Sequence, residues 1–474
     1  MSVGVDAPRF GTVTPFPRVI EVRNPWSGEV VGTVPRASAD DIRRAIDTAH
    51  TYRPALTRHA RAEILERTAA LLGERIGEAA ALITRESGLC WKDTHYEVGR
   101  VRDVLRFAAM EALRDDGEAY SCDITPHGRA RRIFTRREPL AGVIAAITPF
   151  NHPINQVAHK VAPAIASNNR VVLKPSEKTP LSALYFASLL YEAGLPRGML
   201  QVITGDPGEI VAALLDDARV EMVTFTGGVE AGKSIAARAG YRRMVLELGG
   251  NDPLIVMEDA DVAEAAALAA KGSYANSGQR CTAVKRILVH ASVADEFVER
   301  LVAETGQWRF GDPSDSKVDM GTVIDEAAAK RIERRVDDAV SRGARVLAGH
   351  ERRGALYAPT VVDGADPGME LVHRETFGPV SPVMRFATID EAIAISNGTD
   401  YGLSSAVCTN RLDYVTRFVN ELNVGTVNVR EVPGYRLELT PFGGIKDSGL
   451  GYKEGVREAV KSFTNVKTFS LPWD

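Results

Sequence analysis

The chain has 474 residues and a formal net charge of −4, and 45% of its residues are hydrophobic and 25% charged. These values are typical of a globular protein of roughly three domains, and they argue against a nucleic-acid-binding or membrane-surface role. Four scattered cysteines are too few for a disulfide framework or a zinc cluster. No apolar run approaches a membrane span, and residues 1–16 lack the pattern of a signal peptide, so we expect a cytoplasmic protein.

Helical periodicity dominates residues 39–116, where HARAEILERTAALLGERIGEAAALITRESG ends at Gly88 and THYEVGRVRDVLRFAAMEAL is amphipathic. RRIFTRREPLAGVIAAITPF then changes to strand-forming residues. From 140 to 250 the short β runs GVIAAIT, RVVLKP, LQVIT, MVTFTG and RRMVLELGG alternate with helices, and a second series begins near 254 with LIVMED and RILVHA. This alternation predicts an α/β fold with parallel sheets and a domain boundary near Leu248.

Two strand ends carry residues suited to a dinucleotide. EMVTFTGG runs into the helix VEAGKSIAARAG, so Gly227 and Gly228 lie where backbone N–H groups and the helix dipole can bind a phosphate. VVLKPSEKTP places Lys174 and Glu177 after another strand, where a carboxylate accepts hydrogen bonds from a ribose diol and repels a 2′-phosphate. An ordinary turn explains either segment as well, and the chain lacks the G-x-G-x-x-G fingerprint.

Three further residues are candidates for covalent chemistry. Cys281, in GQRCTAV, follows an arginine whose charge can lower a thiol pKa, although a buried, inert cysteine is the alternative. Glu247, in LELGGNDP, lies 34 residues earlier and is either a general base or a salt-bridged surface residue. Asn151, in ITPFNHP, is either an oxyanion donor or a helix cap.

The order of the motifs decides between these alternatives. ITPFNHP, VVLKPSE, VTFTGG, LELGG, GQRCT, RETFGPV and PFGGIKDSG follow one another along the chain. The set closely resembles the aldehyde dehydrogenase superfamily over residues 20–472. The resemblance implies an α/β fold with a Rossmann-like cofactor domain, an α/β catalytic domain and a small β bridging element for homodimers or homotetramers. The corresponding segments are 1–120 and 141–248 with part of 446–462 for the cofactor domain, 249–445 for the catalytic domain, and 121–140 with 463–474 for the bridging element.

The resemblance also implies the roles of individual residues. Asn151, Glu247 and Cys281 fall on the oxyanion residue, the general base and the nucleophile. The cofactor is NAD, with NADP as the alternative. Its residues are Lys174 and Glu177 at the adenosine ribose, Gly205 and Gly228 at the diphosphate, and Glu375 and Phe377 at the nicotinamide side, and Ser176 and Gly227 complete the cofactor-binding set. Asn251 replaces the lysine that the family usually has, and the sequence offers no functional account of it.

These roles define a reaction. The Cys281 thiolate adds to the aldehyde carbonyl, and the Asn151 amide and the Cys281 backbone N–H hold the oxyanion. Oxidation leaves a thioester, which a water activated by Glu247 hydrolyses to a carboxylate. A CoA-acylating enzyme would share Cys281 but would need no water-activating base, so Glu247 counts against that class.

The substrate tunnel implied by the resemblance is polar. Arg280 precedes the nucleophile, and Arg100 maps to a helix position that faces the tunnel. His152 and His159 are seven residues apart, two helical turns, so we expect them to share one helix face with Gln156 between them. Arginine forks bind phosphate and carboxylate well, so these side chains favour a short aldehyde that carries an anion. The alternative is that they pair with carboxylates of the protein itself.

Within the superfamily, EVGR and GQRCTAVKR most resemble the branch that contains non-phosphorylating glyceraldehyde-3-phosphate dehydrogenases and phosphonoacetaldehyde dehydrogenases. PFNHPINQVAHKVAPAI with LKPSEKTPLSAL favours the latter. We therefore predict NAD-dependent oxidation of phosphonoacetaldehyde to phosphonoacetate, a step of phosphonate catabolism. Glyceraldehyde 3-phosphate, succinic semialdehyde, lactaldehyde and sulfoacetaldehyde are the open alternatives.

Overall fold

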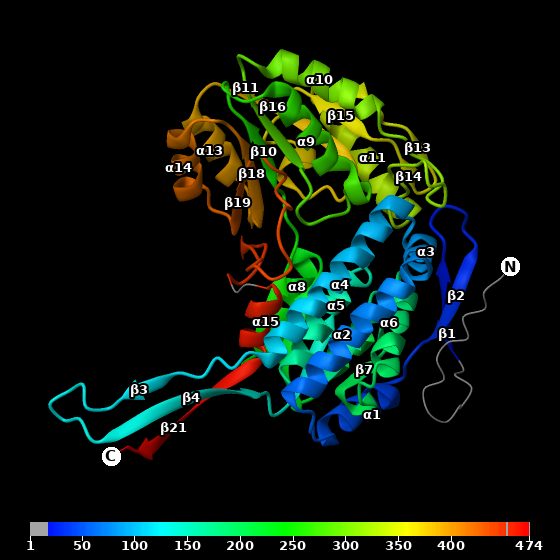
Figure 1. Cartoon of the computed structure of the whole chain (residues 1–474). Coiled ribbons are helices and arrows are strands. Elements are labelled where there is room, and N and C mark those ends of the chain that lie inside the picture. The colour runs from blue at the N-terminus through cyan, green and yellow to red at the C-terminus, as the bar shows by residue number, and fades with distance from the viewer. Residues whose placement is uncertain (1–17, 452–453, 474) are drawn as a thin grey trace.

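Two lobes, each built on an open sheet, make up the body of the molecule, and a narrow arm projects from one of them (Figure 1). The computed structural model describes residues 18–451 and 454–473. Residues 1–16, in which we expect no signal peptide, lie outside the described residues. Within the described part of the chain, no helix is both long and apolar enough to cross a membrane.

The first lobe contains a five-stranded sheet in which all strands are parallel. Its strands, in spatial order, are β7 (Leu200–Val202), β6 (Val171–Lys174), β5 (Val143–Ile147), β8 (Val220–Thr226) and β9 (Arg243–Glu247). Its helices are α1 (Ala39–Thr51), α2 (Arg58–Glu74), α3 (Ile76–Ser87), α4 (Trp91–Leu113), α5 (Asn155–Ala166), α6 (Pro180–Glu192), α7 (Pro207–Asp216), α8 (Val229–Ala239) and α15 (Val456–Ser462).

The apolar character of β5 follows from its burial on both sides. Ile144 and Ala146 pack into the core formed with α2, α4, α5 and α6, whereas Val143, Ala145 and Ile147 pack into the core formed with α1, α7 and α8. A parallel strand with helices on both faces reads as a continuous hydrophobic run. The parallel α/β architecture predicted from the alternating pattern is confirmed.

The second lobe contains a seven-stranded sheet that is parallel except for its edge strand β12. Its strands, in spatial order, are β12 (Arg345–Ala348), β15 (Thr360–Asp363), β16 (Val380–Phe386), β11 (Arg286–His290), β10 (Pro253–Val256), β18 (Ser404–Cys408) and β19 (Thr426–Val429). Its helices are α9 (Val262–Tyr274), α10 (Ala294–Gly306), α11 (Glu326–Ser341), α12 (Glu370–His373), α13 (Ile389–Asn397) and α14 (Leu412–Glu421). The chain leaves the first sheet at Glu247 and enters the second at Pro253.

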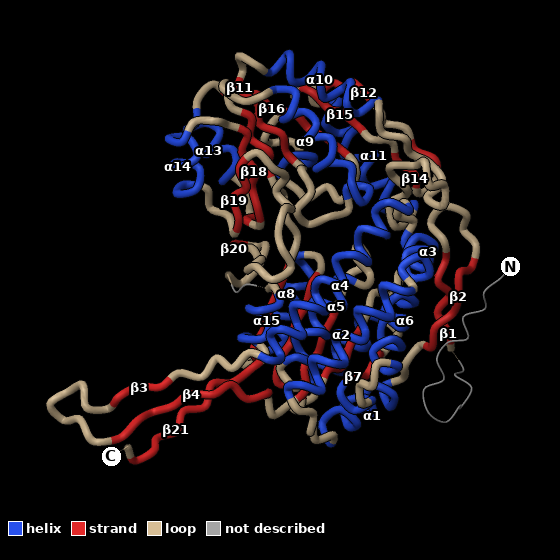
Figure 2. The backbone as a smooth tube through the Cα atoms, in the orientation of Figure 1, coloured by secondary structure: helices blue, strands red, loops and turns tan. Residues whose placement is uncertain are grey.

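The arm is an antiparallel sheet that extends away from the first lobe (Figures 1 and 2). It consists of β3 (Ala119–Ser121), β4 (Arg131–Pro139) and β21 (Thr464–Pro472). β4 and β21 pair over their full length, from Thr464 opposite Pro139 to Pro472 opposite Arg131. The division of the chain into cofactor, catalytic and bridging segments stays a prediction.

Short elements complete the described chain. They are the hairpins β1 (Val19–Arg23) with β2 (Val30–Pro35) and β13 (Arg352–Arg353) with β14 (Leu356–Tyr357), the pair β17 (Tyr401–Gly402) with β20 (Ile445–Lys446), and the 3-10 helices η1 (Arg197–Met199) and η2 (Ala275–Gly278).

Candidate active site

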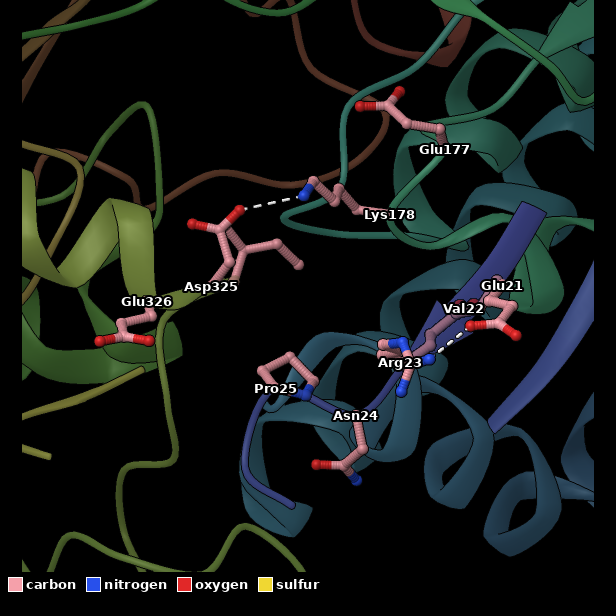
Figure 3. Close-up of a pocket in the computed structure, with 11 residues that line it drawn as sticks. Glu21, Val22, Arg23, Asn24, Pro25, Glu177, Lys178, Asp325 and Glu326 are labelled. Atoms are coloured by element: carbon pink, nitrogen blue, oxygen red, sulfur yellow. Dashed lines mark hydrogen bonds and ion pairs between the residues drawn. The ribbon is translucent and has the colours of Figure 1, made fainter. Parts of the chain in front are cut away.

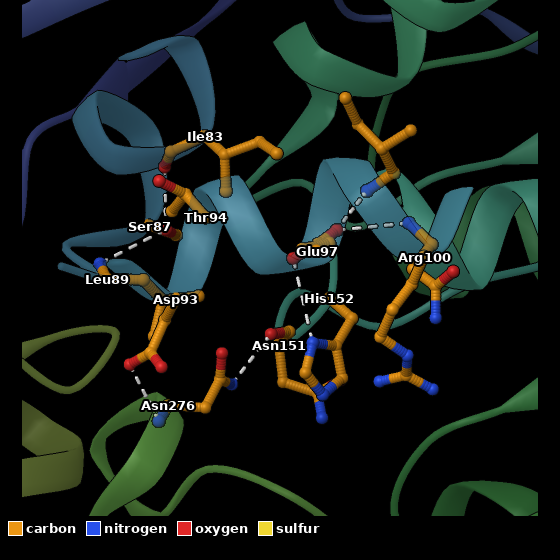
Figure 4. A network of polar contacts seen from close by, with 12 residues as sticks. Ile83, Ser87, Leu89, Asp93, Thr94, Glu97, Arg100, Asn151, His152 and Asn276 are labelled. Atoms are coloured by element: carbon orange, nitrogen blue, oxygen red, sulfur yellow. Dashed lines mark hydrogen bonds and ion pairs between the residues drawn. The ribbon is translucent and has the colours of Figure 1, made fainter. Parts of the chain in front are cut away.

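The loop that carries Cys281 turns sharply before the thiol. Asn276 and Ser277, in η2, have positive φ angles of 60° and 55°. Such conformations are costly for residues with a side chain and cluster at functional sites. Neighbouring segments hold the turn: the Asn276 backbone N–H donates to Asp93 Oδ2 at 2.8 Å, and its side-chain amide donates to the Asn151 carbonyl oxygen at 2.9 Å (Figure 4).

Asn151 reaches the nucleophile loop from the turn after β5. Its buried side-chain Nδ2 donates to the Gln279 carbonyl oxygen at 2.9 Å. An amide nitrogen carries two N–H groups, and this bond uses one of them. The other can serve an oxygen of a substrate bound to Cys281, as an oxyanion donor must.

The two glycines after Glu247 let three segments meet. A Cβ on Gly250 would lie 2.4 Å from the Cys281 carbonyl oxygen, and a Cβ on Gly249 would lie 2.4 Å from Oε2 of Glu375. At Gly250 the neighbour is backbone, and at Gly249 it is the end of the Glu375 side chain, so the connection between the two sheets packs directly against the nucleophile loop and against Glu375. Glu247 is buried at the end of β9, at the start of this connection.

The electrostatic environment of the thiol is dominated by burial. Burial raises the pKa of Cys281 to about 11, and the largest opposing influence is the ammonium of Lys285. Lys285 is buried and donates to the Arg280 carbonyl oxygen, which belongs to the same peptide unit as the Cys281 N–H. An ammonium on that carbonyl polarises the peptide and strengthens the N–H as a donor.

Arg280, the residue that the sequence offered as able to lower the thiol pKa, is therefore not the main cationic neighbour of Cys281. Its Nη2 donates to the Gly272 carbonyl oxygen at 2.8 Å. The sequence-based reasoning missed Lys285, although it lies only four residues after the thiol. A lysine four residues after the thiol was the sequence signal for a second cation near Cys281.

Arg100 and His159 converge on a carboxylate that the sequence did not single out. Glu438 accepts a hydrogen bond from Arg100 Nε, and its Oε2 lies 2.6 Å from His159 Nε2 and 3.6 Å from Arg436 Nη2. Pairing with protein carboxylates is thus realised for Arg100 and His159. Arg436 and Glu438 immediately precede the PFGG motif, and that position was the only sequence signal for them.

His152 and His159 do not share a helix face, which corrects the prediction from their spacing. α5 begins at Asn155, so His152 lies in the preceding turn. It precedes Pro153, and the residue before a proline is disfavoured from helical geometry. Its Nδ1 lies 3.6 Å from Glu97 Oε2 (Figure 4), and burial lowers its pKa, so the imidazole is neutral near pH 7.

The predicted cofactor residues border two cavities. One, of about 320 Å³, is lined by Glu177 and Lys178 from the first lobe and by Asp325 from the second, and Lys178 and Asp325 form an ion pair of 3.1 Å (Figure 3). The other, of about 240 Å³, is lined by Gly228 and Glu375. The structure therefore brings Gly228 and Glu375 together and places Glu177 at a different opening.

The smaller cavity lies at the start of α8, and the diphosphate role of Gly228 there stays a prediction. α8 begins after Gly228 without a side-chain cap, so its first N–H groups and the positive end of its dipole are available to an anion. Two arginines of the second lobe line the same cavity, together with four acidic residues: Arg335, Arg374, Glu230, Glu375, Asp400 and Asp447. An added Cβ on Gly228 would meet nothing within 4 Å, which shows open space beside the helix end. The neighbouring Gly227 donates its N–H to the Glu247 carbonyl oxygen at 3.1 Å.

The predicted ribose contacts form a local network. Lys174 Nζ lies 3.2 Å from Glu177 Oε2, and Ser176 Oγ accepts the Lys178 backbone N–H at 3.2 Å. Burial lowers the pKa of Lys174, although the Glu177 carboxylate opposes this shift. Glu177 is thus partly balanced by its own lysine.

Two predicted cofactor residues and Asn251 have structural partners. Phe377 packs edge-on against Phe150 at 5.9 Å. Gly205 is a close-packed position, because a Cβ there would lie 3.0 Å from Ile210 Cδ1. Asn251 Nδ2 donates to the Val372 carbonyl oxygen at 2.6 Å, which ties the crossing between the sheets to the segment that carries Glu375.

Comparison with known proteins agrees with this arrangement. A sequence profile of the aldehyde dehydrogenase family matches residues 13–469. The 3-sulfolactaldehyde dehydrogenase of Priestia aryabhattai is 39% identical over 457 residues, which are 95% of this chain and 94% of that protein. The sulfoacetaldehyde dehydrogenase of Neptuniibacter caesariensis is 38% identical over 411 residues, 87% of this chain and 90% of that one.

A solved structure extends the similarity to three dimensions. The NADP-dependent glyceraldehyde-3-phosphate dehydrogenase of Bacillus halodurans, complexed with NADP, superimposes with a TM-score of 0.94 at 37% identity, covering 97% of this chain and 96% of that one. The chain belongs to the aldehyde dehydrogenase family, whose enzymes are NAD(P)-dependent oxidoreductases. The superfamily resemblance and the fold expected from the motifs are both confirmed.

Proposed function

We propose that the protein oxidises a short aldehyde carrying an anionic group to the corresponding carboxylate, with NAD as the oxidant. The observation that carries the proposal is a group of arginines around the nucleophile. Arg280 interacts electrostatically with both Arg100 and Cys281, and Arg436 is a cationic neighbour of the same thiol. Guanidinium groups placed beside a reacting carbon favour a substrate whose far end is negatively charged.

Phosphonoacetaldehyde, oxidised to phosphonoacetate, is the substrate that the sequence predicts within this class. The two relatives described above independently support an anionic substrate, because the aldehydes in their names carry a sulfonate. Succinic semialdehyde carries a carboxylate and glyceraldehyde 3-phosphate a phosphate, so both belong to the class. Lactaldehyde is neutral and serves as a test of it.

The chemistry follows from the positions of three residues. Cys281 loses its proton to solvent, its Sγ attacks the carbonyl carbon as the thiolate, and the Asn151 amide and the Cys281 N–H hold the oxygen as it gains charge. Lys285 strengthens the second donor through the Arg280 carbonyl. NAD held by the predicted cofactor residues would be the hydride acceptor in the oxidation of the Cys281 adduct to a thioester. Glu247 then takes a proton from a water, which hydrolyses the thioester and frees the thiol.

We infer a preference for NAD over NADP from Glu177. A 2′-phosphate near this carboxylate would meet a negative charge, whereas a ribose diol can donate hydrogen bonds to it. Lys174 balances part of that charge at 3.2 Å, so the preference depends on how the pair is oriented. The ratio of kcat/KM for NAD and NADP measures it.

We propose that the arm is the contact between copies in a homodimer or homotetramer. Its strands, the loop between β3 and β4, and the residue after β21 expose large apolar side chains that the rest of the described chain does not cover, and such patches mark association surfaces. They are Tyr120, Ile124, Ile133, Phe469, Leu471 and Trp473. Sedimentation of the intact chain and of Phe469→Ser tests this, and a monomeric intact chain would contradict it.

A substrate panel tests the proposed function. Phosphonoacetaldehyde, sulfoacetaldehyde, succinic semialdehyde, lactaldehyde and propanal are assayed with NAD and with NADP, with and without CoA. The expected result is a carboxylate product without CoA and a kcat/KM for at least one anionic aldehyde about tenfold or more above that of propanal. Propanal as the best substrate, or a strict need for CoA, would contradict the proposal.

A further inference from the structure

Glu438 occupies the middle of the arginine group. It lies on the loop between β19 and β20, is 5% exposed, and contacts Arg100, His159 and Arg436. Although burial opposes ionisation, Arg436, His159 and Arg100 hold the pKa of this carboxyl far below its usual range. One negative charge is therefore fixed inside the region that the sequence predicts to bind the substrate's anion.

The charge of the region is close to balanced. Arg100, Arg280 and Arg436 contribute three positive charges, and Glu438 cancels one of them. Two further carboxyls, on Asp93 and Glu97, face the same region, the first beside Arg280 and the second beside His152. The ionisable groups whose charges act on this region are Asp93, Tyr96, Glu97, Arg100, His152, His159, Arg280, Cys281, Arg436 and Glu438, and, acting on the thiol, Asp252, Lys285 and Glu375. The three carboxyl groups of Asp93, Glu97 and Glu438 therefore stand against three guanidinium groups, which leaves less positive charge than a doubly charged ligand carries.

The guanidinium N–H groups that do not pair with Glu438 are enough to bind one small anion. Glu438 accepts a hydrogen bond from Nε of Arg100 and forms an ion pair with Nη2 of Arg436. Nη1 of Arg436 and Nε of Arg280 are buried, and neither has a hydrogen-bond partner within residues 18–451 and 454–473. Buried donors without acceptors are costly, so a ligand that supplies acceptor oxygens is stabilised there.

We propose that Glu438 sets the charge selectivity of this anion subsite, so that the enzyme takes a singly charged head group in preference to a doubly charged one. The inference rests on the proposed function and narrows it: sulfonates, carboxylates and the singly protonated form of a phosphonate are the favoured ligands. Glu438 is a specificity-determining residue in this view. It rejects the second charge by like-charge repulsion, as specificity often requires.

The wild-type enzyme provides the first test. kcat/KM is measured for phosphonoacetaldehyde and sulfoacetaldehyde from below to above the second pKa of the phosphonate. The sulfonate keeps one charge throughout, so it corrects for titration of the protein's own groups. The expected result is a phosphonate-to-sulfonate ratio that falls as the phosphonate becomes a dianion. A ratio that stays constant or rises would overturn the inference.

The variant Glu438→Gln provides the second test. Removing the fixed charge should raise the same ratio, measured where the phosphonate is a dianion, by roughly tenfold to thirtyfold, the effect of one charge about 8 Å away at an effective dielectric of about 20. Glu431→Gln makes the same charge change on the same loop, outside the cluster, and should leave the ratio unchanged. An unchanged ratio in Glu438→Gln would overturn the inference.

The outcomes separate the two proposals. Suppose that kcat/KM for both anionic aldehydes exceeds that for propanal, but that the phosphonate-to-sulfonate ratio changes neither with pH nor in Glu438→Gln. Only the proposed charge selectivity is then refuted. If kcat/KM for neither anionic aldehyde exceeds that for propanal, both the proposed function and the charge selectivity that rests on it are refuted. Should Glu438→Gln not fold, the wild-type pH series and Glu438→Asp, which keeps the charge and should keep the ratio, decide the question.

Discussion

Gly250→Ala should disable the enzyme although it replaces no side chain that takes part in the chemistry. The new Cβ would lie 2.4 Å from the Cys281 carbonyl oxygen and 3.0 Å from both Asp252 Oδ1 and Leu403 Cδ2. Because an ordinary contact is about 3.5 Å, the methyl group or the Cys281 peptide must move by about 1 Å. The methyl group has close neighbours in three directions and cannot move away from all of them, so we expect the nucleophile loop to move.

The size of the effect follows from that displacement. A misplacement of about 1 Å at a reacting group costs on the order of a hundredfold in rate, so kcat should fall by about that factor. Overpacking should also lower stability by about 1–3 kcal/mol, which a thermal melt measures separately. Gly249→Ala is the matched control: its Cβ meets the end of the Glu375 side chain, which can rotate away.

Steady-state kinetics distinguish the two variants. Gly250→Ala should lose kcat with little change in KM for NAD, whereas Gly249→Ala should raise KM for NAD more than it lowers kcat, because Glu375 is the predicted cofactor contact. A folded Gly250→Ala protein with a wild-type kcat would refute the idea that this glycine positions the nucleophile.

Three further predictions concern charge. In the cofactor-free enzyme, alkylation of Cys281 by iodoacetamide should keep accelerating up to about pH 11, because burial keeps the thiol protonated below its raised pKa. Lys285→Met removes a cation that stabilises the thiolate and should move this curve to higher pH, and an unmoved curve would assign Lys285 another role. Glu177→Gln should raise kcat/KM for NADP relative to NAD, whereas an unchanged ratio would mean that the carboxylate turns away from the ribose. Arg436→Ala should lower kcat/KM for the preferred anionic aldehyde by roughly tenfold to a hundredfold and that for propanal far less, and equal losses would limit Arg436 to a role in stability or at the thiol.

The elements of the fold were predictable because their signals are local. β5 is apolar throughout since both its faces are covered, and the glycine pair at 227–228 sits between β8 and α8, as the strand-to-helix pattern indicated. The positions of Asn151, Glu247 and Cys281 came from the motif order, and their assigned roles stay predictions. Pro153 also indicates the turn at His152, whereas the seven-residue spacing to His159 wrongly predicted a shared helix face.

The charge pattern around the thiol was not predictable, because it depends on contacts between distant segments. Arg100 and Glu438 are separated by 338 residues, and only the folded chain shows that they pair. The sequence also shows Lys285 near Cys281 without showing that its ammonium lies on the Arg280 carbonyl. A charged residue reveals its role only when its partner and its burial are known.

Trapping the thioester tests the central claim most directly. Glu247→Gln is mixed with NAD and the preferred aldehyde, quenched, and examined by intact-mass measurement and peptide mapping. The expected result is a burst of about one NADH per site and an acyl adduct on the peptide that carries Cys281, with neither in Cys281→Ser. Unchanged steady turnover in Glu247→Gln, or an adduct on Cys90, Cys122 or Cys408 in place of Cys281, would contradict the assignment of nucleophile and base.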